Sequence, residues 1–329
     1  MKSVNQVKVT EWSPKEKILL CFEKYCDFNP DMKLTNSYHN FLASFSQSKP
    51  EYIFHTIHQD ECQLVYKKHI DEILPEYCEK WGINKIMFIL LGESSCNPSV
   101  STYNKLASMG ISLCFHWPDT GPGWAVDTMY SLGELADLHV SWDVPKSDFH
   151  SSLPKLNNHI SLWAPQDRNL YRFKSYKDKN KKVAFYGRPF LQRAKHLEYI
   201  KSKLKDFYFG GGQREESLSP EDYAVFVADS KIILNFPAHG FGFSQLKSRV
   251  IEAMACGSLV LELENDSTPT FFEAGKDYIS CSSIDDMIAK ADYYINNEEE
   301  AEKIALSGHN KYINNHTARH YWDLVFENL

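Results

Sequence analysis

The segment from Lys247 to Gly257 holds residue types well suited to binding a polar ligand. Glu252 supplies a carboxylate that can accept hydrogen bonds from two neighbouring hydroxyls, and such charge-assisted bonds are roughly twice as strong as neutral ones. Lys247 and Arg249 add two cations that suit an anionic group. Ala255 and Gly257 are small, so a helix over this segment would end close to a sheet and turn tightly into the next strand.

The sequence around Glu252 resembles that of known glycosyltransferases. Residues 249–257, RVIEAMACG, are similar to the EAMACG helix of retaining two-domain glycosyltransferases, and more closely to the R-x-x-E-x-x-A-C-G version of the spore-coat CgeB-like family. The resemblance implies an α/β protein of the GT-B fold, in which two Rossmann-like domains face each other across a cleft. It also implies that Glu252 accepts hydrogen bonds from the ribose hydroxyls of a nucleotide-sugar donor.

Other segments fall where this resemblance predicts. Residues 228–235, ADSKIILN, are similar to the family's strand that leads to the donor site. Residues 183–188, VAFYGR, are similar to the first strand of its C-terminal domain, and residues 308–326 to its terminal element. The resemblance covers roughly residues 183–326, whereas the first half of the chain matches only in outline.

The donor's diphosphate needs a metal ion, backbone amides at a helix N-terminus or basic side chains to balance its charge. No DxD motif of the metal-dependent transferases stands in a plausible loop, so we expect cations to bind the diphosphate without a metal cofactor. The alternative for each basic residue taken singly is that it is a solvated charge on the protein surface. The expected donor-binding residues are Gly187, Arg188, Arg193, Lys247, Arg249 and Glu252.

One position departs from the broader retaining class, which carries a first Glu immediately before a Gly-Phe-Gly turn, eight positions ahead of the ribose-binding Glu. Here Gly-Phe-Gly occupies residues 240–242, but His239 precedes it and lies 13 positions ahead of Glu252. The acidic partner is missing or displaced, which leaves retaining stereochemistry open. His239 is expected to be either a hydrogen-bond partner for sugar hydroxyls or an ordinary loop histidine.

A polar turn in the N-terminal half offers a second group of candidates. Residues 114–119, CFHWPD, follow an expected strand, and open α/β sheets present their ligands at the carboxyl ends of strands. The segment resembles the turn that these enzymes point into the cleft from the N-terminal domain. The resemblance implies that His116 contacts the transferring sugar and that Asp119 acts as a base or an acceptor ligand. The alternative is that both are structural turn residues.

Three other patterns carry less weight. Gly210–Gly212 forms a flexible turn that suggests phosphate binding only weakly, because no further motif accompanies it. His316 and His320 have the spacing of two metal ligands on a helix, but neither an HExxH motif nor a third ligand accompanies them. The eight cysteines lack CxxC spacing and are expected to be reduced and mostly buried.

Short apolar runs alternate with longer segments of mixed charge, as strands and helices do in parallel sheets. Expected strands cover 17–22, 52–56, 85–91, 112–116, 139–142, 183–186, 207–209, 232–235, 259–262 and 278–281. Helices are expected between them, the longest over 62–81. We expect a Rossmann-like acceptor domain over 1–165, a Rossmann-like donor domain over 166–310, and a final helix over 311–329 that packs back on the first domain.

Length and composition agree with two domains, since 329 residues with 43% hydrophobic content exceed the size of one small core. The net charge of −7 argues against nucleic acid as a partner, except as a modified-base acceptor. The N-terminus lacks the apolar core of a signal peptide, and no apolar run approaches the ~20 residues that span a membrane. A cytoplasmic protein without a membrane span is expected.

The sequence thus predicts a glycosyltransferase that moves a hexosyl or pentosyl unit from a nucleotide-sugar donor to a glycan, a protein or another acceptor. Two alternatives stay open. One is a catalytically silent sugar-nucleotide-binding protein, because a fold does not establish activity and the acid before Gly240 is missing. The other is a sugar-nucleotide epimerase, which would form product from the donor alone.

Overall fold

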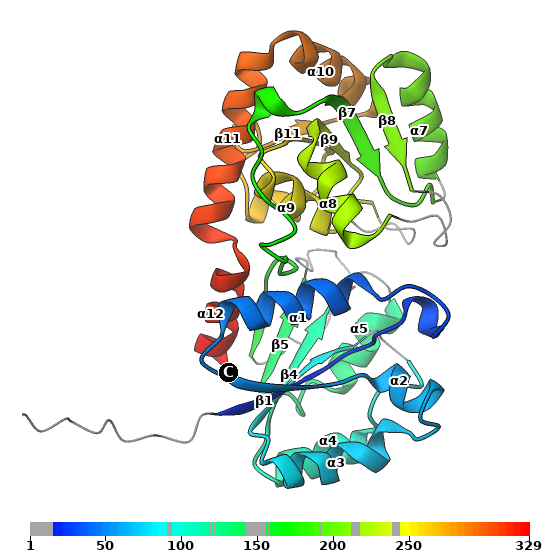
Figure 1. Cartoon of the computed structure of the whole chain (residues 1–329), viewed down its shortest axis with the longest axis vertical. Helices are drawn as coiled ribbons and strands as arrows, with labels where there is room; N and C mark the ends of the chain where they lie inside the picture. Colours follow the sequence, from blue (N-terminus) through cyan, green and yellow to red (C-terminus); the bar gives the residue numbers. More distant parts are fainter. Residues whose placement is uncertain are drawn as a thin grey trace, which may run out of the picture.

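The computed structural model describes residues 16–90, 94–118, 120, 123–142, 156, 158–190, 192–211, 218–238 and 244–329. Two parallel sheets, one from each half of the chain, form two separate bodies joined by a linker, residues 162–180, and by the last two helices (Figure 1). Each of the ten expected strands is present, with its ends shifted by a residue or two.

The first sheet has six parallel strands in the order β2-β1-β3-β4-β5-β6. Its central strands are buried along most of their length, as expected of a parallel sheet covered by helices on both faces. The strands are β1 (Lys17–Cys21), β2 (Ile53–Ile57), β3 (Lys85–Ile89), β4 (Ser112–Trp117), β5 (Leu138–Ser141) and β6 (His159–Ser161). The helices are α1 (Asn36–Ser48), α2 (Gln59–Leu64), α3 (Ile70–Trp81), α4 (Val100–Ser108) and α5 (Gly123–Ser131).

Two details of this half differ from expectation. The single helix expected over 62–81 is divided, because His69 and Glu72 form a capping box that starts α3 at Ile70. The edge strand β6 was not expected, because its three residues, His159–Ser161, include only one apolar side chain. Short edge strands of this kind carry little periodic signal.

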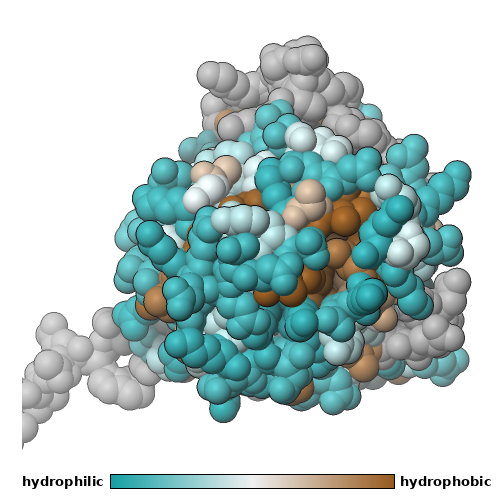
Figure 2. Space-filling model, turned by 90° about the horizontal axis from the view of Figure 1, so that it is seen from above, coloured by the Kyte–Doolittle hydropathy of each residue, from teal (hydrophilic) through white to brown (hydrophobic). Residues whose placement is uncertain are grey.

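The second sheet has five parallel strands in the order β11-β10-β9-β7-β8. The strands are β7 (Lys181–Tyr186), β8 (Phe207–Gly210), β9 (Ser230–Asn235), β10 (Leu259–Leu263) and β11 (Ile279–Cys281). The helices are α7 (Gln192–Lys203), α8 (Pro220–Ala228), α9 (Ser248–Ala255), α10 (Ile284–Asn296) and α11 (Glu298–Asn315). The face at this end of the molecule is largely hydrophilic, with hydrophobic side chains gathered near its middle (Figure 2).

The last helix, α12 (Ala318–Asn328), belongs spatially to the first half of the chain (Figure 1). It packs against α1, where the indole of Trp322 donates to Ser44 Oγ at 3.1 Å and its ring lies 4.9 Å from that of Phe45. Residues 311–315, which were expected in this final helix, belong instead to α11. A new helix begins after Thr317, whose hydroxyl accepts from the His320 N–H and so caps the N-terminus.

All eight cysteines are free thiols, and seven of them are buried. Across the described ranges, we find no helix that combines the length and the apolar character of a membrane span.

Candidate active site

Two arginines lie against one aromatic ring at the carboxyl edge of the second sheet. The guanidinium carbon of Arg249, in the first turn of α9, lies 4.5 Å from the ring centroid of Phe185, and that of Arg193 on α7 lies 5.8 Å from it. A cation over a ring is favourable by ~0.5–2 kcal/mol, but two adjacent cations repel. Burial, with the charge of Arg249, lowers the pKa of Arg193 to about 10.

Arg249 is held by three hydrogen bonds. Its Nε and Nη2 donate to the Tyr186 carbonyl at 3.1 and 2.7 Å, and its Nη1 donates to Asn235 Oδ1 at 2.8 Å. The Asn235 amide is oriented in turn, because its Nδ2 donates to Glu262 Oε1 at 2.6 Å. A guanidinium carries five N–H donors, so this arrangement leaves two for a ligand.

Glycines allow this close packing. A Cβ at Gly187 would lie only 2.6 Å from Arg249 Nη2, and a Cβ at Gly211 would lie 2.7 Å from the Gly187 nitrogen. Both backbones have positive φ, 153° and 92°, which glycine adopts readily. The structure therefore brings Gly187 into contact with Arg249, whereas Gly212 lies outside the described residues.

Arg193 has fewer partners than Arg249. Its Nη1 donates to the Arg188 carbonyl at 3.2 Å, and its buried Nε has no hydrogen-bond partner. Within the described ranges, neither Arg193 nor Arg249 forms an ion pair with a carboxylate. The side chain of Arg188 is exposed close by. Two of the expected cations, Arg193 and Arg249, thus meet at the end of β7, and Arg188 follows that strand closely in sequence.

Glu252 lies one helical turn after Arg249 and is 4% exposed. Its Oε2 accepts from the Tyr223 hydroxyl at 2.5 Å. Burial raises the pKa of Glu252 above its ordinary value, although hydrogen bonds from Tyr223 and Tyr171 and the charge of Arg249 oppose the rise. Sequence reasoning missed both tyrosines, because Tyr171 precedes the first expected strand of the second domain, Tyr223 lies on α8, and neither belongs to a motif.

Asn235 and Glu262 were also missed, and both stand where adjacent strands end. Glu262 is fully buried, and burial raises its pKa from 4.5 to about 7. Their position at the carboxyl ends of β9 and β10 was a usable signal, because such ends meet at one edge of a parallel sheet.

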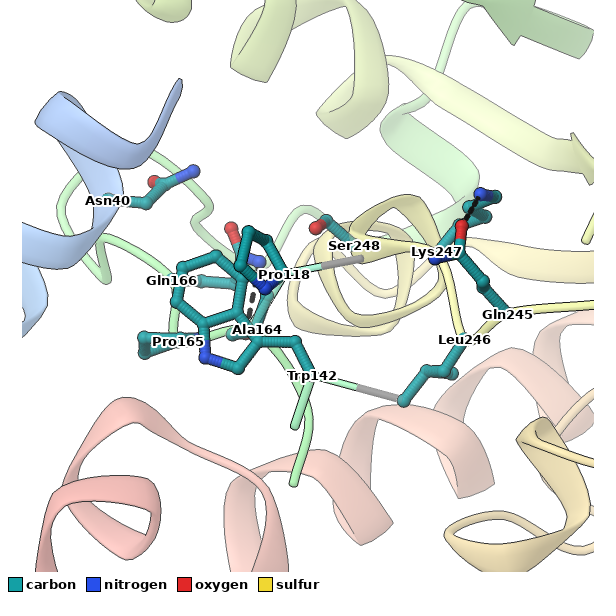
Figure 3. Close-up of a pocket in the computed structure, with 10 residues that line it drawn as sticks. All are labelled: Asn40, Pro118, Trp142, Ala164, Pro165, Gln166, Gln245, Leu246, Lys247 and Ser248. Carbon is teal, nitrogen blue, oxygen red and sulfur yellow. Dashed lines mark hydrogen bonds between the residues drawn. The ribbon is translucent and has the colours of Figure 1, made fainter. Parts of the chain in front are cut away.

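Lys247 belongs to a pocket between the two halves of the molecule (Figure 3). It is the N-cap residue of α9, and its Nζ donates to Gln245 Oε1. Residues after β4 and β5 line the opposite side, so the carboxyl edge of the first sheet faces the second domain. The lining residues are Asn40, Pro118, Trp142, Ala164, Pro165, Gln166, Gln245, Leu246, Lys247 and Ser248.

His116 does not line this pocket. Its ring is fully buried, with Nδ1 2.6 Å from the Tyr321 hydroxyl and Nε2 3.4 Å from Cys114 Sγ. Burial lowers the pKa of His116 to about 3, which keeps the ring neutral. In this structure His116 therefore contacts α12, and Pro118 reaches the pocket in its place. Asp119 and His239 lie outside the described residues.

The two C-terminal histidines have local partners. His316 Nε2 lies 3.1 Å from the Phe271 carbonyl, and His320 Nδ1 lies 2.8 Å from Thr317 Oγ1. In the part of the chain that the structure describes, no three His, Cys, Asp or Glu side chains gather as a metal site would require.

Comparison with known proteins defines the fold. A family model described as glycosyl transferase-like matches residues 177–327. Comparison with curated protein sequences finds no match. Solved structures that are similar over 95% or more of this chain include HepE from Anabaena in complex with UDP-glucose, sucrose-phosphate synthase from Thermosynechococcus elongatus and a glycosyltransferase from Rickettsia africae.

The similarity to these structures lies in the backbone. HepE has a TM-score of 0.62 at 11% identity, and the alignment covers 95% of this chain and 100% of HepE. The synthase has a TM-score of 0.62 at 10% identity, and the alignment covers 95% of this chain and 98% of the synthase. The Rickettsia protein has a TM-score of 0.61 at 10% identity, and the alignment covers 96% of this chain and 99% of that protein. The chain therefore has the GT-B fold expected from its sequence, and its C-terminal part is similar to glycosyltransferases. The closer resemblance to the CgeB-like family stays a prediction.

Proposed function

We propose that the protein is a glycosyltransferase that takes a sugar from a nucleotide-sugar donor bound mainly by its second domain. The observation that carries this proposal is the pair Arg193 and Arg249, which share the Phe185 ring and repel each other. A diphosphate between them would relieve that repulsion and give the buried Nε of Arg193 an acceptor. The structure of HepE with UDP-glucose, on the same fold, supports a donor of this class.

The proposed donor lies across the carboxyl edge of the second sheet. Its diphosphate contacts Arg193 and Arg249, with Arg188 and Lys247 as further cations, and its ribose hydroxyls donate to Glu252. To reach Glu252 the ribose must share the carboxylate with Tyr223, which donates to Oε2, and with Tyr171.

In the proposed reaction the two arginines stabilise the charge that develops on the departing diphosphate. Fixed cations in a water-poor site act strongly on such charge, and the remaining task is to place donor and acceptor together. We propose that this transfer needs no metal ion. A hexosyl or pentosyl donor, the acceptor, retention of stereochemistry and a cytoplasmic location stay predictions.

Binding of nucleotide sugars tests the proposal directly. Calorimetry with UDP, GDP, UDP-glucose and other nucleotide sugars should give binding that Arg193→Met weakens ~10-fold or more, because a charge-assisted bond contributes ~1.5–3 kcal/mol. Lys182→Met is the matched control, since Lys182 is a cation at the opposite end of β7 that pairs with Asp206 at 2.9 Å. If wild-type protein binds no nucleotide or nucleotide sugar, the proposal is wrong.

Product analysis separates the alternatives. A transferase releases nucleoside diphosphate and slowly hydrolyses donor without acceptor, a silent binding protein leaves the donor intact, and an epimerase changes the sugar while it stays on the nucleotide.

A further inference from the structure

Gln166, which lines the interdomain pocket, has a buried side-chain amide whose nitrogen is hydrogen-bonded and whose oxygen is not. It is 1% exposed, and its Nε2 donates to the Ala164 carbonyl at 3.1 Å. Its Oε1 has no hydrogen-bond partner within the described part of the chain. A buried amide oxygen without a donor is unfavourable, so a ligand that donates a hydrogen bond there would remove a penalty built into the fold.

Trp142 forms an apolar wall of the same pocket. Its indole N–H donates to the Tyr321 hydroxyl at 2.8 Å, and that hydroxyl also lies 2.6 Å from His116 Nδ1. The only polar atom of the indole is therefore turned to α12, and the surface left for the pocket is hydrocarbon. An aromatic face carries partial negative charge and attracts C–H groups that carry partial positive charge.

The rest of the lining is mostly neutral. Asn40 comes from α1, and its Oδ1 accepts from the Asp167 N–H at 3.2 Å, which orients the amide. In Figure 3 the Gln166 amide lies between Asn40 on one side and Ser248, the first residue of α9, on the other. Among the described residues that line the pocket, Lys247 is the one with a charged side chain, and it donates to Gln245. Amides, a hydroxyl and an aromatic ring thus meet in one place.

A sugar ring has the complementary chemistry. Its hydroxyls donate and accept hydrogen bonds around the edge, as amide side chains require, and its axial C–H groups make one face apolar. We infer that the interdomain pocket is a saccharide subsite, in which a pyranose lies against Trp142 and one of its hydroxyls donates to Gln166 Oε1. This inference rests on the proposed function, because a transferase must hold a sugar beside the departing diphosphate.

The same chemistry could come from the donor's own sugar or from a sugar of the acceptor, and two variants distinguish these sources. Gln166→Met keeps the length of the side chain and removes the amide, while Trp142→Leu removes the aromatic face. Gln47→Met is the matched control, because Gln47 also contacts the linker, through Nε2 to Asp167 Oδ1 at 2.7 Å, and does not line the pocket. Melting temperatures verify that each variant is folded.

Two measurements are made on every variant. Calorimetry gives the affinity for UDP and for the nucleotide sugar that wild-type protein binds best. Saturation-transfer NMR in the presence of UDP gives the affinity for the methyl glycosides of glucose, galactose, mannose and N-acetylglucosamine. If the subsite holds the donor's sugar, both variants lose ~10-fold affinity for the nucleotide sugar and none for UDP. If it holds an acceptor sugar, both variants lose ~10-fold affinity for a methyl glycoside and none for the nucleotide sugar.

Trp142→Phe adds a conservative test, because it keeps an aromatic face and loses the bond to Tyr321. It should recover most of the sugar affinity that Trp142→Leu loses. Unchanged affinity for every sugar and nucleotide sugar in both Gln166→Met and Trp142→Leu would overturn the inference while leaving the proposed function standing. Failure of wild-type protein to bind any nucleotide would remove the proposed function and this inference together.

Discussion

The two edges of the second sheet use similar side chains in opposite ways. At the amino edge, Lys179 is 3% exposed, and its Nζ donates to the carbonyls of Ala228 and Cys256 at 2.7 and 2.9 Å and to Ser258 Oγ at 3.1 Å. All three of its N–H groups are therefore used. At the carboxyl edge, Arg193 and Arg249 face each other with no carboxylate paired to them among the described residues.

Asp229 completes the contrast at the amino edge. It accepts from Lys174 and Lys181 at 2.6 and 2.8 Å. Burial raises the pKa of its carboxyl, but the bonds from these lysines outweigh burial and hold the pKa well below the ordinary value. Charge at the amino edge is thus neutralised within the protein and contributes to stability. Charge at the carboxyl edge is left for a ligand. Mutations at the amino edge should therefore lower stability, and mutations at the carboxyl edge should weaken ligand binding.

Arg249→Met should have the largest effect on ligand binding. It removes the donors that face the diphosphate and should weaken nucleotide-sugar binding ~10–100-fold, because charge-assisted bonds contribute ~1.5–3 kcal/mol. Its melting temperature should fall less than that of Lys179→Met, since relief of the repulsion with Arg193 partly offsets the lost bonds to Tyr186 and Asn235. Calorimetry and thermal melting on one preparation check both. A large fall in stability with normal affinity would reverse the roles assigned to the two edges.

Lys179→Met should show the opposite pattern. It leaves three buried acceptors without their donor, which should lower the free energy of unfolding by roughly 2–4 kcal/mol. The affinity of the folded protein for nucleotide should change less than twofold, because Lys179 lies at the far edge of the sheet. Urea denaturation measures the first quantity and calorimetry the second. Normal stability would show that the three acceptors of Lys179 find other donors in the variant.

Glu262 should make stability depend on pH. Its pKa is raised from 4.5 to about 7, so between these values the folded protein binds a proton that the unfolded chain has released. Its contribution to stability is therefore present below pH 4.5 and is lost as pH rises to about 7, a change of roughly 3 kcal/mol at most. Relative to wild type, Glu262→Gln should gain stability from pH 5 to pH 8. A difference that is constant with pH would contradict this.

Glu252→Gln should weaken donor binding ~10-fold, because the variant keeps the shape of the side chain and removes the charge that strengthens the ribose bonds. Tyr223 can still donate to the amide oxygen, so the fold should be preserved. Calorimetry with the best-bound nucleotide sugar measures the loss, and Glu221→Gln on α8 serves as the control. Equal affinities for the two variants would remove Glu252 from the donor site.

Chelation should have the smallest effect. If cations alone balance the diphosphate, EDTA leaves the turnover rate unchanged. Loss of activity that magnesium or manganese restores would show that a metal ion shares this task with Arg193 and Arg249.

Sequence reasoning worked best where the signal is local. Apolar runs such as residues 86–91 predicted their strands, and the motif around Glu252 predicted helix α9 and the strand after it. It could not predict partners brought together by folding. Asn235 accepts from Arg249, Tyr223 donates to Glu252, and Glu262 accepts from Asn235, all from separate elements, and no spacing in the chain records these contacts.

His116 was predicted to contact the ligand, and the structure places it elsewhere. Its place at the end of a strand indicated a ligand contact, but the side chain meets Tyr321, which lies 205 residues away. The strand β4 runs to Trp117, so His116 lies inside the sheet, and Pro118, the first residue after the strand, lines the pocket.

The return of α12 has a consequence for how the molecule can be divided and how it can move. Because Trp322 packs on Phe45 and bonds to Ser44, the core of the first half is completed by the last residues of the chain. A fragment cut at the linker would lack this helix, exposing the aromatic surface of α1, and would not be an autonomous folding unit. The polypeptide also crosses between the halves twice, at the linker and before α12, and two connections restrict the relative motion of the halves more than one would.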